Sequence, residues 1–288
     1  MASRIHLSAV IDATARLDEG VVVGPHAVVD PAAELAEGVV VGPHAFVGAG
    51  VTVGAGTRIG ASAFVQGPTT IGRDNVVFPH ACIGTDPQDL KFRGEETRLE
   101  IGDRNHFREF CTVHRGTAKG GALTTIGDDN LFMAYAHVAH DCRVGNRTIF
   151  ANGATLAGHV EVQDDASISA FSAVHQFCRV GRHAYIGGYS VIVQDALPFV
   201  KTVGHKPAFY GLNRIGLERK GFAEETIDRL DRAVRILTRG GLHLGDAVAR
   251  LRADFDDPEV LYLADFVASA ERGVIRTLPG RKGSRGGG

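Results

Sequence analysis

An apolar residue recurs at every sixth position through most of the first 192 residues. The run steps from Ile5 to Ile83 without a gap, returns in phase from Ile101 to Val113, and continues from Ile126 to Ile192 after an insertion. Neither the helical period of 3.6 nor the strand period of 2 gives a strict repeat of six. The repeat therefore indicates a solenoid in which each hexad supplies one short strand and one corner.

Glycine follows the apolar residue in many hexads, as expected where the backbone turns sharply or needs a positive φ. Three hexads can close one triangular coil, and stacked coils bury a continuous apolar column while every strand pairs with its neighbours. The 29 hexads make nearly ten coils. We therefore predict an all-β solenoid, a parallel β-helix of hexapeptide repeats with about ten coils, over residues 1–198.

Two segments interrupt the repeat, and the pattern changes after Pro198. Residues 85–100 and 114–125 are polar and glycine-bearing, which predicts loops that leave the coils. From Ile227 onward the apolar residues follow helical spacing, and Asp257–Pro258 is typical of a helix start. We expect a C-terminal α-helical domain over residues 199–280 and a disordered tail over 281–288.

Charge and composition argue against several classes of protein. The net charge of −2 gives no global basic field for nucleic acid or an anionic membrane. No apolar run is long enough to cross a membrane, and the first residues do not resemble a secretory signal, so a cytoplasmic location is expected. The cysteines show no CxxC spacing and are expected to be buried free thiols; they are Cys82, Cys111, Cys142 and Cys178.

Stacking of hexads three apart places many histidines on one face. Val113, Val138, Leu156 and Val174 form such a stack if the second loop bulges out without using a face. The side chains beside this stack are His114, His137, His140, His159, His175 and Gln176, together with Gly158. A neutral imidazole is a natural general base, and a glycine N–H can approach a developing oxyanion. No nucleophile elbow is present, so direct attack by an activated substrate hydroxyl fits better than an acyl-enzyme.

A zinc site is the main alternative for these histidines. His137 and His140, with His114 or His159, could offer three imidazoles to the metal, as in the γ-class carbonic anhydrases, which share the hexapeptide repeat. Five histidines exceed the usual three, however, and the long loops and helical end have no purpose in such a site. We therefore predict no metal and no cofactor. A purely structural β-helix would not need the histidines at all.

Several longer stretches resemble the UDP-N-acetylglucosamine acyltransferases of lipid A biosynthesis. They are PQDLKFRGE (87–95), TVHRGT (112–117), AHVAHDCRVGN (136–146), ATLAGHV (154–160), AVHQFCRVG (173–181) and GLNRIGLERKGF (211–222). The resemblance covers about residues 5–276 in order. It implies a left-handed β-helix that moves a 3-hydroxyacyl group from acyl carrier protein to the 3-hydroxyl of UDP-N-acetylglucosamine. It also implies a homotrimer with active sites between subunits.

The resemblance assigns roles by position. It places the general base at His140, the aspartate that orients this base at Asp141, and the backbone donor to the oxyanion at Gly158. The positions that match substrate contacts are Asp89, Lys91, His114, His137, His159, His175, Gln176, Asn213, Arg219 and Lys220. The end of the acyl groove falls at Tyr185 and Gly188. The chain has Ile215 where the family often has a glutamate, so nucleotide recognition differs in detail.

A basic rim is expected to steer the acidic carrier protein. Its candidates are Arg179, Arg182, Arg214, Arg219 and Lys220. A related N-acyltransferase of lipid A synthesis is a closer rival, although that relative usually carries an extra N-terminal domain and here the hexads begin at Ile5. The sequence leaves open the acyl length and whether the acceptor is the ordinary sugar or its 3-amino analogue.

Overall fold

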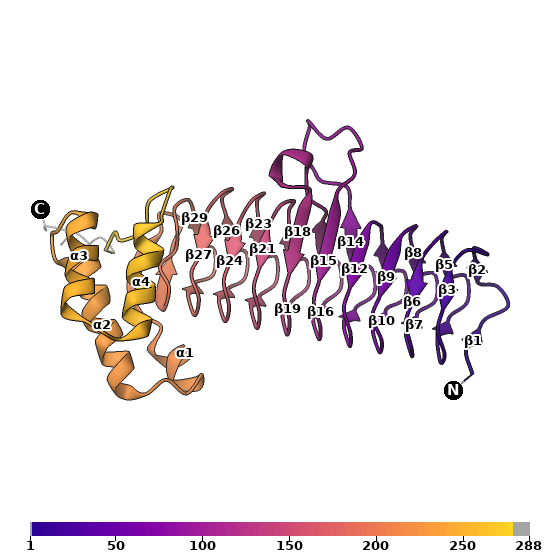
Figure 1. The fold of residues 1–288 in the computed structure, drawn as a ribbon, viewed down its shortest axis with the longest axis horizontal. Helices are drawn as coiled ribbons and strands as arrows, with labels where there is room; N and C mark the ends of the chain where they lie inside the picture. The colour runs from indigo at the N-terminus through magenta and orange to yellow at the C-terminus, as the bar shows by residue number, and fades with distance from the viewer. Residues whose placement is uncertain (1, 279–288) are drawn as a thin grey trace, which may run out of the picture.

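The computed structural model describes residues 2–278 and consists of a long parallel β-solenoid with helices at its C-terminal end (Figure 1). The solenoid strands β1 to β29 equal the 29 hexads in number, and each strand contains the apolar residue of one hexad. Outside the two insertions, strands pair in register with the strand 18 residues away, as Ile5 does with Val23, and across the insertions the separation is larger, as between Val113 and Val138. The predicted parallel solenoid is confirmed.

The solenoid has three sheets, which we call A, B and C. Sheet A contains β1 (Arg4–Ile5), β4 (Val22–Val23), β7 (Val40–Val41), β10 (Arg58–Ile59), β13 (Val76–Val77), β16 (His106–Phe107), β19 (Leu131–Phe132), β22 (Ile149–Phe150), β25 (Ser167–Ile168), β28 (Tyr185–Ile186), β30 (Val200–Val203) and β31 (Ala208–Leu212). Sheet B contains β2 (Val10–Ile11), β5 (Val28–Val29), β8 (Phe46–Val47), β11 (Phe64–Val65), β14 (Cys82–Thr85), β17 (Thr112–His114), β20 (His137–Val138), β23 (Thr155–Leu156), β26 (Ala173–Val174) and β29 (Val191–Ile192). Sheet C contains β3 (Arg16–Leu17), β6 (Glu34–Leu35), β9 (Val51–Val53), β12 (Thr69–Ile71), β15 (Arg98–Ile101), β18 (Leu123–Ile126), β21 (Arg143–Val144), β24 (Glu161–Val162) and β27 (Arg179–Val180).

The glycines that follow the apolar residues serve close packing of the coils rather than an unusual φ. A Cβ on Gly42 would lie 2.8 Å from the backbone nitrogen of Ala61 in the next coil, and one on Gly54 would lie 2.5 Å from the carbonyl carbon of Gly72. Positive φ occurs instead three residues after the apolar position, for example at His26 and Asp141. Among these glycines only Gly84, with φ 76°, has the expected positive φ; a tight approach of the backbone between coils, which was not among the reasons expected from the sequence, is the general reason for glycine here.

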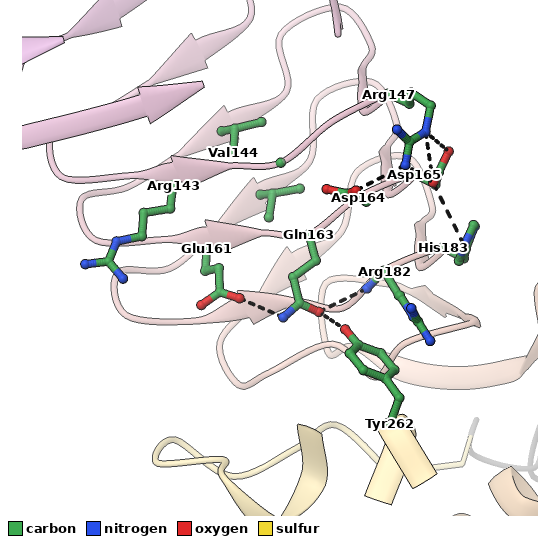
Figure 2. Close-up of a pocket in the computed structure, with 12 residues that line it drawn as sticks. Arg143, Val144, Arg147, Glu161, Gln163, Asp164, Asp165, Arg182, His183 and Tyr262 are labelled. Carbon is green, nitrogen blue, oxygen red and sulfur yellow. Dashed lines mark hydrogen bonds and ion pairs between the residues drawn. The ribbon is translucent and has the colours of Figure 1, made fainter. Parts of the chain in front are cut away.

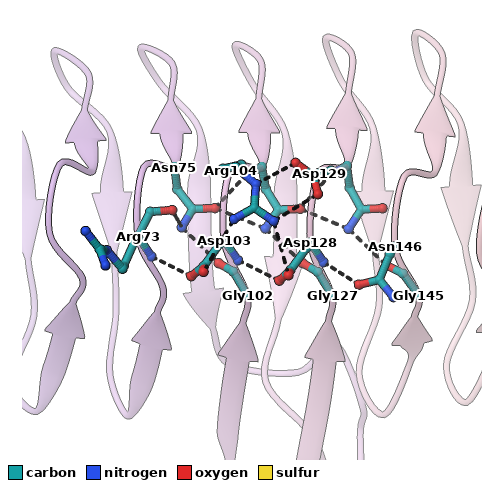
Figure 3. Close-up of polar contacts among 12 residues, drawn as sticks. Arg73, Asn75, Gly102, Asp103, Arg104, Gly127, Asp128, Asp129, Gly145 and Asn146 are labelled. Atoms are coloured by element: carbon teal, nitrogen blue, oxygen red, sulfur yellow. Dashed lines mark hydrogen bonds and ion pairs between the residues drawn. The ribbon is translucent and has the colours of Figure 1, made fainter.

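Two side-chain ladders tie the coils together at the corner between sheets C and A (Figure 3). In the inner ladder, the backbone N–H of Asn105 donates to Oδ1 of Asn75 (2.9 Å), and that of Asn130 donates to Oδ1 of Asn105 (2.9 Å). In the outer ladder, the backbone N–H of Asp103 donates to Oδ1 of Asp128 (2.8 Å). These side chains continue the backbone pairing through the corner, so buried amides stay bonded where no strand exists.

Both predicted loops leave the coils, between β14 and β15 and between β17 and β18 (Figure 1). The second loop carries a short 3₁₀ helix, η1 (Ala118–Gly120). Because β17 pairs directly with β20, this loop bulges out without using a face of the solenoid, as predicted.

Sheet A continues beyond residue 198, since β30 pairs with β28 and β31 follows antiparallel to β30. Four helices come next: α1 (Arg214–Arg219), α2 (Glu224–Arg239), α3 (Leu244–Asp254) and α4 (Pro258–Ala268). The helical spacing read from the sequence corresponds to α2, α3 and α4. The predicted tail at 281–288 lies outside the described residues. Between residues 2 and 278, no helix has both the length and the apolar character needed to cross a membrane.

A polar seam fastens α4 to the solenoid beside a cavity of about 610 Å³ (Figure 2). The Arg182 guanidinium pairs with Glu259 and lies 3.7 Å from the ring centroid of Tyr262. The side-chain oxygen of Gln163 accepts hydrogen bonds from the Tyr262 hydroxyl and the Arg182 backbone. Apolar residues of the helices pack with those of β30, β31 and the segment before them to form a second core. The helices are thus fixed at one end of the solenoid.

Candidate functional site

Registers in sheet B confirm the predicted stack of Val113, Val138, Leu156 and Val174. Among the imidazoles beside this stack, His114 meets His137 edge-on with ring centroids 4.9 Å apart, and His140 meets His159 edge-on at 5.3 Å. Nδ1 of His137 shares a hydrogen bond with the Thr112 hydroxyl (2.7 Å).

His175 lies one coil farther along and is exposed, and its Nδ1 lies 3.2 Å from the carbonyl oxygen of Gln176. The structure therefore brings four of the five predicted histidines into ring contacts and leaves His175 at the margin of the group.

His140 and Asp141 form a hydrogen-bonded pair because both lie in the corner between β20 and β21. Adjacent residues of a strand would point to opposite sides, but Asp141 has φ 60° and its carboxylate turns back toward the ring. Nδ1 of His140 lies 2.7 Å from Oδ2 of Asp141. A proton on Nδ1 is thereby shared with the carboxylate, which leaves Nε2 as the free, basic nitrogen.

Hydrogen bonds keep the buried Asp141 carboxylate ionised. Burial alone would raise its pKa, but the hydrogen bonds from His140 and from the hydroxyl and backbone of Thr117 outweigh this effect and lower the pKa. A charged carboxylate that is 1% exposed is costly unless its oxygens are satisfied, and here both oxygens accept hydrogen bonds. The pair thus joins a fixed negative charge to an imidazole.

Gly158 supplies both space and a free N–H beside His140. A Cβ on Gly158 would lie 2.8 Å from Nε2 of His140, so the ring packs directly on this glycine. No described residue accepts a hydrogen bond from the Gly158 N–H. The second position after the apolar residue also holds prolines, which have no N–H, at positions 25, 31, 43 and 79. The fold therefore does not require a hydrogen bond from the backbone N–H at this position of the repeat. At Gly158 this free N–H lies next to the His140 imidazole.

The neighbouring imidazoles are neutral near pH 7. Burial lowers the pKa of His114 to about 4, and burial also lowers the pKa of His137 and of His159. Buried Nδ1 of His114 has no hydrogen-bond partner among the described residues. Neutral rings of this kind can donate or accept hydrogen bonds toward a polar ligand without adding charge.

A cavity of about 890 Å³ collects residues from both loops and three coils. It is lined by Gln88, Asp89, Leu90, Lys91, Thr117, Lys119, Gly120, His140, His159, Gln176 and Phe177. Oδ1 of Asp89 accepts the backbone N–H of Lys91 (2.9 Å), which shapes the tip of the first loop. Five positions singled out from the sequence thus border one cavity, whereas His114 and His137 do not line it.

A second cavity, of about 570 Å³, lies on sheet A and shares no lining residue with the first. Asn213, Ile215, Arg219 and Tyr185 all line it. Two predicted substrate contacts, Asn213 and Arg219, and one predicted residue of the acyl groove, Tyr185, therefore border the same cavity, whereas Lys220 does not. A Cβ on Gly188 would meet only a carbonyl oxygen at 3.4 Å, so there is open space at that position.

Most cations of the predicted basic rim form ion pairs with carboxylates of the same chain. Arg182 pairs with Glu259, and the other ion pairs are Arg179–Asp195 (2.8 Å), Arg214–Asp228 (2.8 Å) and Lys220–Asp165 (2.6 Å). Arg219 has no ion-pair partner among the described residues and faces the second cavity. Of the five cations, it is the one best placed to meet a ligand.

The histidines do not form the three-imidazole zinc site considered above. Within residues 2–278, the candidate metal ligands that lie within 4.8 Å of one another are His140, Asp141 and His159. Both Asp141 oxygens already accept hydrogen bonds, and His137 lies outside this group. All four cysteines are free; Cys82 is only half-buried, whereas the other three are buried as predicted.

Sequence reasoning missed four residues that contact this group. Thr117 and Gly120 pack on Asp141, Thr124 accepts its backbone N–H (2.8 Å), and Phe177 stacks on His159 with centroids 4.5 Å apart. Thr117 belongs to the TVHRGT stretch, but its contact with a residue 24 positions later depends on the path of the loop. No local pattern could have revealed it.

Comparison with known proteins gives two family matches and many close relatives. Residues 195–275 match the family described as UDP N-acetylglucosamine O-acyltransferase, domain 2, and residues 123–158 match bacterial transferase hexapeptide repeats. The acyl-[acyl-carrier-protein]–UDP-N-acetylglucosamine O-acyltransferase of Alkalilimnicola ehrlichii is 52% identical over 275 residues, covering 95% of this chain and 100% of that protein. The enzyme of the same name from Paraburkholderia phymatum is 48% identical over 280 residues, with the same coverage. The crystal structure of the UDP-N-acetylglucosamine O-acyltransferase of Moraxella catarrhalis has a TM-score of 0.84 at 36% identity, covering 94% of this chain and 99% of that one.

Proposed function

Because this chain belongs to the UDP-N-acetylglucosamine O-acyltransferase family, we propose that it transfers a 3-hydroxyacyl group from acyl carrier protein to the 3-hydroxyl of UDP-N-acetylglucosamine. This reaction is the first step of lipid A synthesis. The observation that carries the mechanism is a free imidazole nitrogen of His140 beside the unpaired N–H of Gly158, in a cavity large enough for a sugar.

His140 acts as the general base in the proposed reaction. Its Nε2 takes the proton from the sugar 3-hydroxyl as that oxygen attacks the thioester carbonyl carbon. The resulting tetrahedral oxyanion accepts a hydrogen bond from the Gly158 N–H. Collapse of this intermediate breaks the carbon–sulfur bond, and the departing thiolate takes the proton back from His140. Asp141 stabilises the transient imidazolium and holds the ring in one tautomer.

The substrate contacts follow from the lining of the first cavity. Lys91 provides a mobile ammonium for the diphosphate, and Asp89 and Gln176 offer hydrogen bonds to the sugar. Burial lowers the pKa of His159, so its ring at the edge of the cavity is neutral. A charged ring, whose Nε2 lies 3.6 Å from Oδ2 of Asp141, would compete with His140 for this carboxylate. We assign His114 and His137 a supporting role, as neutral polar groups beside the sugar site.

We propose that neighbouring subunits of a homotrimer complete each active site. The base lies in the cavity beside sheet B, whereas Asn213 and Arg219 line a separate cavity on sheet A of the same chain. One substrate molecule could not use both cavities of one chain as a single site. If sheet A of one copy faces sheet B of the next, the two cavities meet and form one cleft.

Exposed aromatic rings mark the corner at which copies could pack. In the turns between sheets A and B, residues at one repeating position stack along the solenoid: they include His80, Phe110, Tyr135, Phe171 and Tyr189. Tyr135 is 63% exposed and Tyr189 is 71% exposed, and both have positive φ, where bulky residues are disfavoured. Burial against other copies would offset this local cost. This corner borders sheet A, which carries the second cavity, and sheet B, whose far corner carries the first.

Complementation between inactive variants tests the shared site. Co-expressed His140→Gln and Arg219→Glu chains are expected to restore activity in about a quarter of the sites, because random mixing pairs an intact half from each copy that often. Each variant alone should be strongly impaired at low substrate concentration. A control mixture of His140→Gln with Asp141→Asn, which damage the same half-site, should show no more activity than Asp141→Asn alone. Equal failure of both mixtures, with assembly shown by light scattering, would mean that each site lies within one chain.

A transfer assay tests the reaction itself. Purified protein with UDP-N-acetylglucosamine and a ladder of 3-hydroxyacyl carrier proteins should yield an acylated sugar nucleotide, detected by mass spectrometry. Treatment with alkaline hydroxylamine should release the acyl group, because the expected linkage is an ester and an amide would resist. Absence of product with every donor would refute the proposed reaction. A parallel assay with the 3-amino analogue as acceptor, whose product would be a hydroxylamine-resistant amide, tests the alternative acceptor.

A further inference from the structure

Thr117 in the second loop holds the buried carboxylate of Asp141 through two hydrogen bonds. Its backbone N–H donates to Oδ1 (2.8 Å), and its hydroxyl donates to Oδ2 (2.7 Å). Thr117 is 6% exposed and the Asp141 side chain 1%, so water competes little for these bonds. Oδ2 is also the oxygen that faces Nδ1 of His140. The loop therefore contacts the same atom that orients the imidazole.

The direction of the Thr117 hydroxyl is fixed by its own surroundings. Thr117 caps η1, and its Oγ1 accepts the backbone N–H of Gly120 (3.3 Å). Since this donor occupies one lone pair, the single hydroxyl proton remains available for the Asp141 carboxylate. Thr117 is thus a donor to Asp141 rather than a competing acceptor.

Gly120 also packs directly against the Asp141 carboxylate. A Cβ at this position would overlap Cγ and both oxygens of Asp141, whereas the φ of Gly120 is not in the positive range. Space, and not backbone conformation, is therefore what requires glycine here. The backbone N–H of Asp141 in turn donates to the buried Thr124 hydroxyl (2.8 Å), just after the loop. Both the main chain and the side chain of Asp141 are held by the segment 117–124.

We propose that Thr117 is a positioning residue that acts on His140 through Asp141. The proposal rests on the role of His140 as general base. With both oxygens held, the carboxylate has one orientation, in which Oδ2 accepts the Nδ1 proton and leaves Nε2 facing the cavity. Loss of that orientation slows the chemical step, because a misaligned base transfers a proton poorly even when the substrate binds normally.

The first test is Thr117→Val, which removes the hydroxyl and keeps the shape. We expect kcat to fall about 10- to 100-fold, as for a lost hydrogen bond to a charged group, with KM for both substrates changed by less than about three-fold. Thr117→Ser should restore most of kcat because it returns the donor. Thr155→Val is the matched control, since that hydroxyl donates to the Gly153 carbonyl and not to the site.

A double-mutant cycle separates action through Asp141 from a general effect on the loop. In an Asp141→Asn background, Thr117→Val should lower kcat less than about two-fold further, because its target is already altered. The same fold-loss in both backgrounds, or a loss that Thr117→Ser does not repair, would overturn the proposal. Thermal unfolding of each variant identifies any that fail to fold, and Thr117→Ser then decides the outcome. Full activity of His140→Gln would instead refute the role of His140 as general base, on which the proposal rests, whereas absence of transfer by the unchanged protein would refute the proposed function.

Discussion

Replacement of His140 by glutamine is expected to lower kcat by about 10²- to 10⁴-fold, the usual contribution of a general base. Glutamine fills similar space against Gly158 and can still hydrogen-bond Asp141, but it cannot take a proton at neutral pH. Because the substrate contacts in the cavity remain, KM for the sugar nucleotide should change little. Steady-state kinetics with varied sugar nucleotide and varied acyl carrier protein would give both parameters.

Two controls sharpen this prediction. His243→Gln changes an exposed histidine at the start of α3, far along the chain from the site residues, and should leave kcat unchanged. Asp141→Asn should give a large but smaller loss, because the base is present yet no longer held in one tautomer. A loss of only a few-fold for His140→Gln would show that another group removes the proton, and the arrangement around Nε2 would need a different explanation.

The solenoid could be predicted because its core obeys one local rule. The apolar residues of the hexad repeat are buried from Val23 onward, and an 18-residue register follows where three hexads close a coil without an insertion. The role of the glycines was not predicted, since a sharp turn or a positive φ also favours this residue. The contacts of Gly42 and Gly54 with the next coil show that close packing is the reason there. The strands β30 and β31 lack the hexad pattern, so their addition to sheet A was not visible in the sequence.

The site could be predicted in part for the same reason. Stacking places His137, His140 and His159 together because they sit at fixed offsets from buried apolar residues. The pairing of His140 with Asp141 needed the corner at Asp141, and the contact of Thr117 needed the path of a loop. Arg219 and Lys220 look equivalent in the sequence, but Lys220 is held by Asp165 while Arg219 faces the second cavity. Partner choice among surface charges depends on tertiary geometry that no short motif encodes.

Asn105→Leu is expected to lower the free energy of unfolding by about 3–5 kcal/mol, because it strands buried polar groups in the inner ladder. Nδ2 of Asn105 donates to Oδ1 of Asn75 (3.0 Å) and to the Gly127 carbonyl (2.9 Å), and its Oδ1 accepts the backbone and side-chain amides of Asn130 (both 2.9 Å). Leucine offers none of these partners. The buried Asn130 N–H and the Gly127 carbonyl would then lose their ladder bonds.

The end of the same ladder provides the matched comparison. Thr148→Val removes one side-chain hydrogen bond, from the Thr148 hydroxyl to Asn130, and should cost about 1 kcal/mol. Urea denaturation followed by circular dichroism gives both losses, and hydrogen exchange at the Asn130 amide reports whether the damage is local. Coils of a solenoid can unfold separately, so faster exchange should centre on the coils around Asn105. A loss for Asn105→Leu no larger than that for Thr148→Val would mean that the turn re-forms its bonds locally and that the ladder does not hold the coils together.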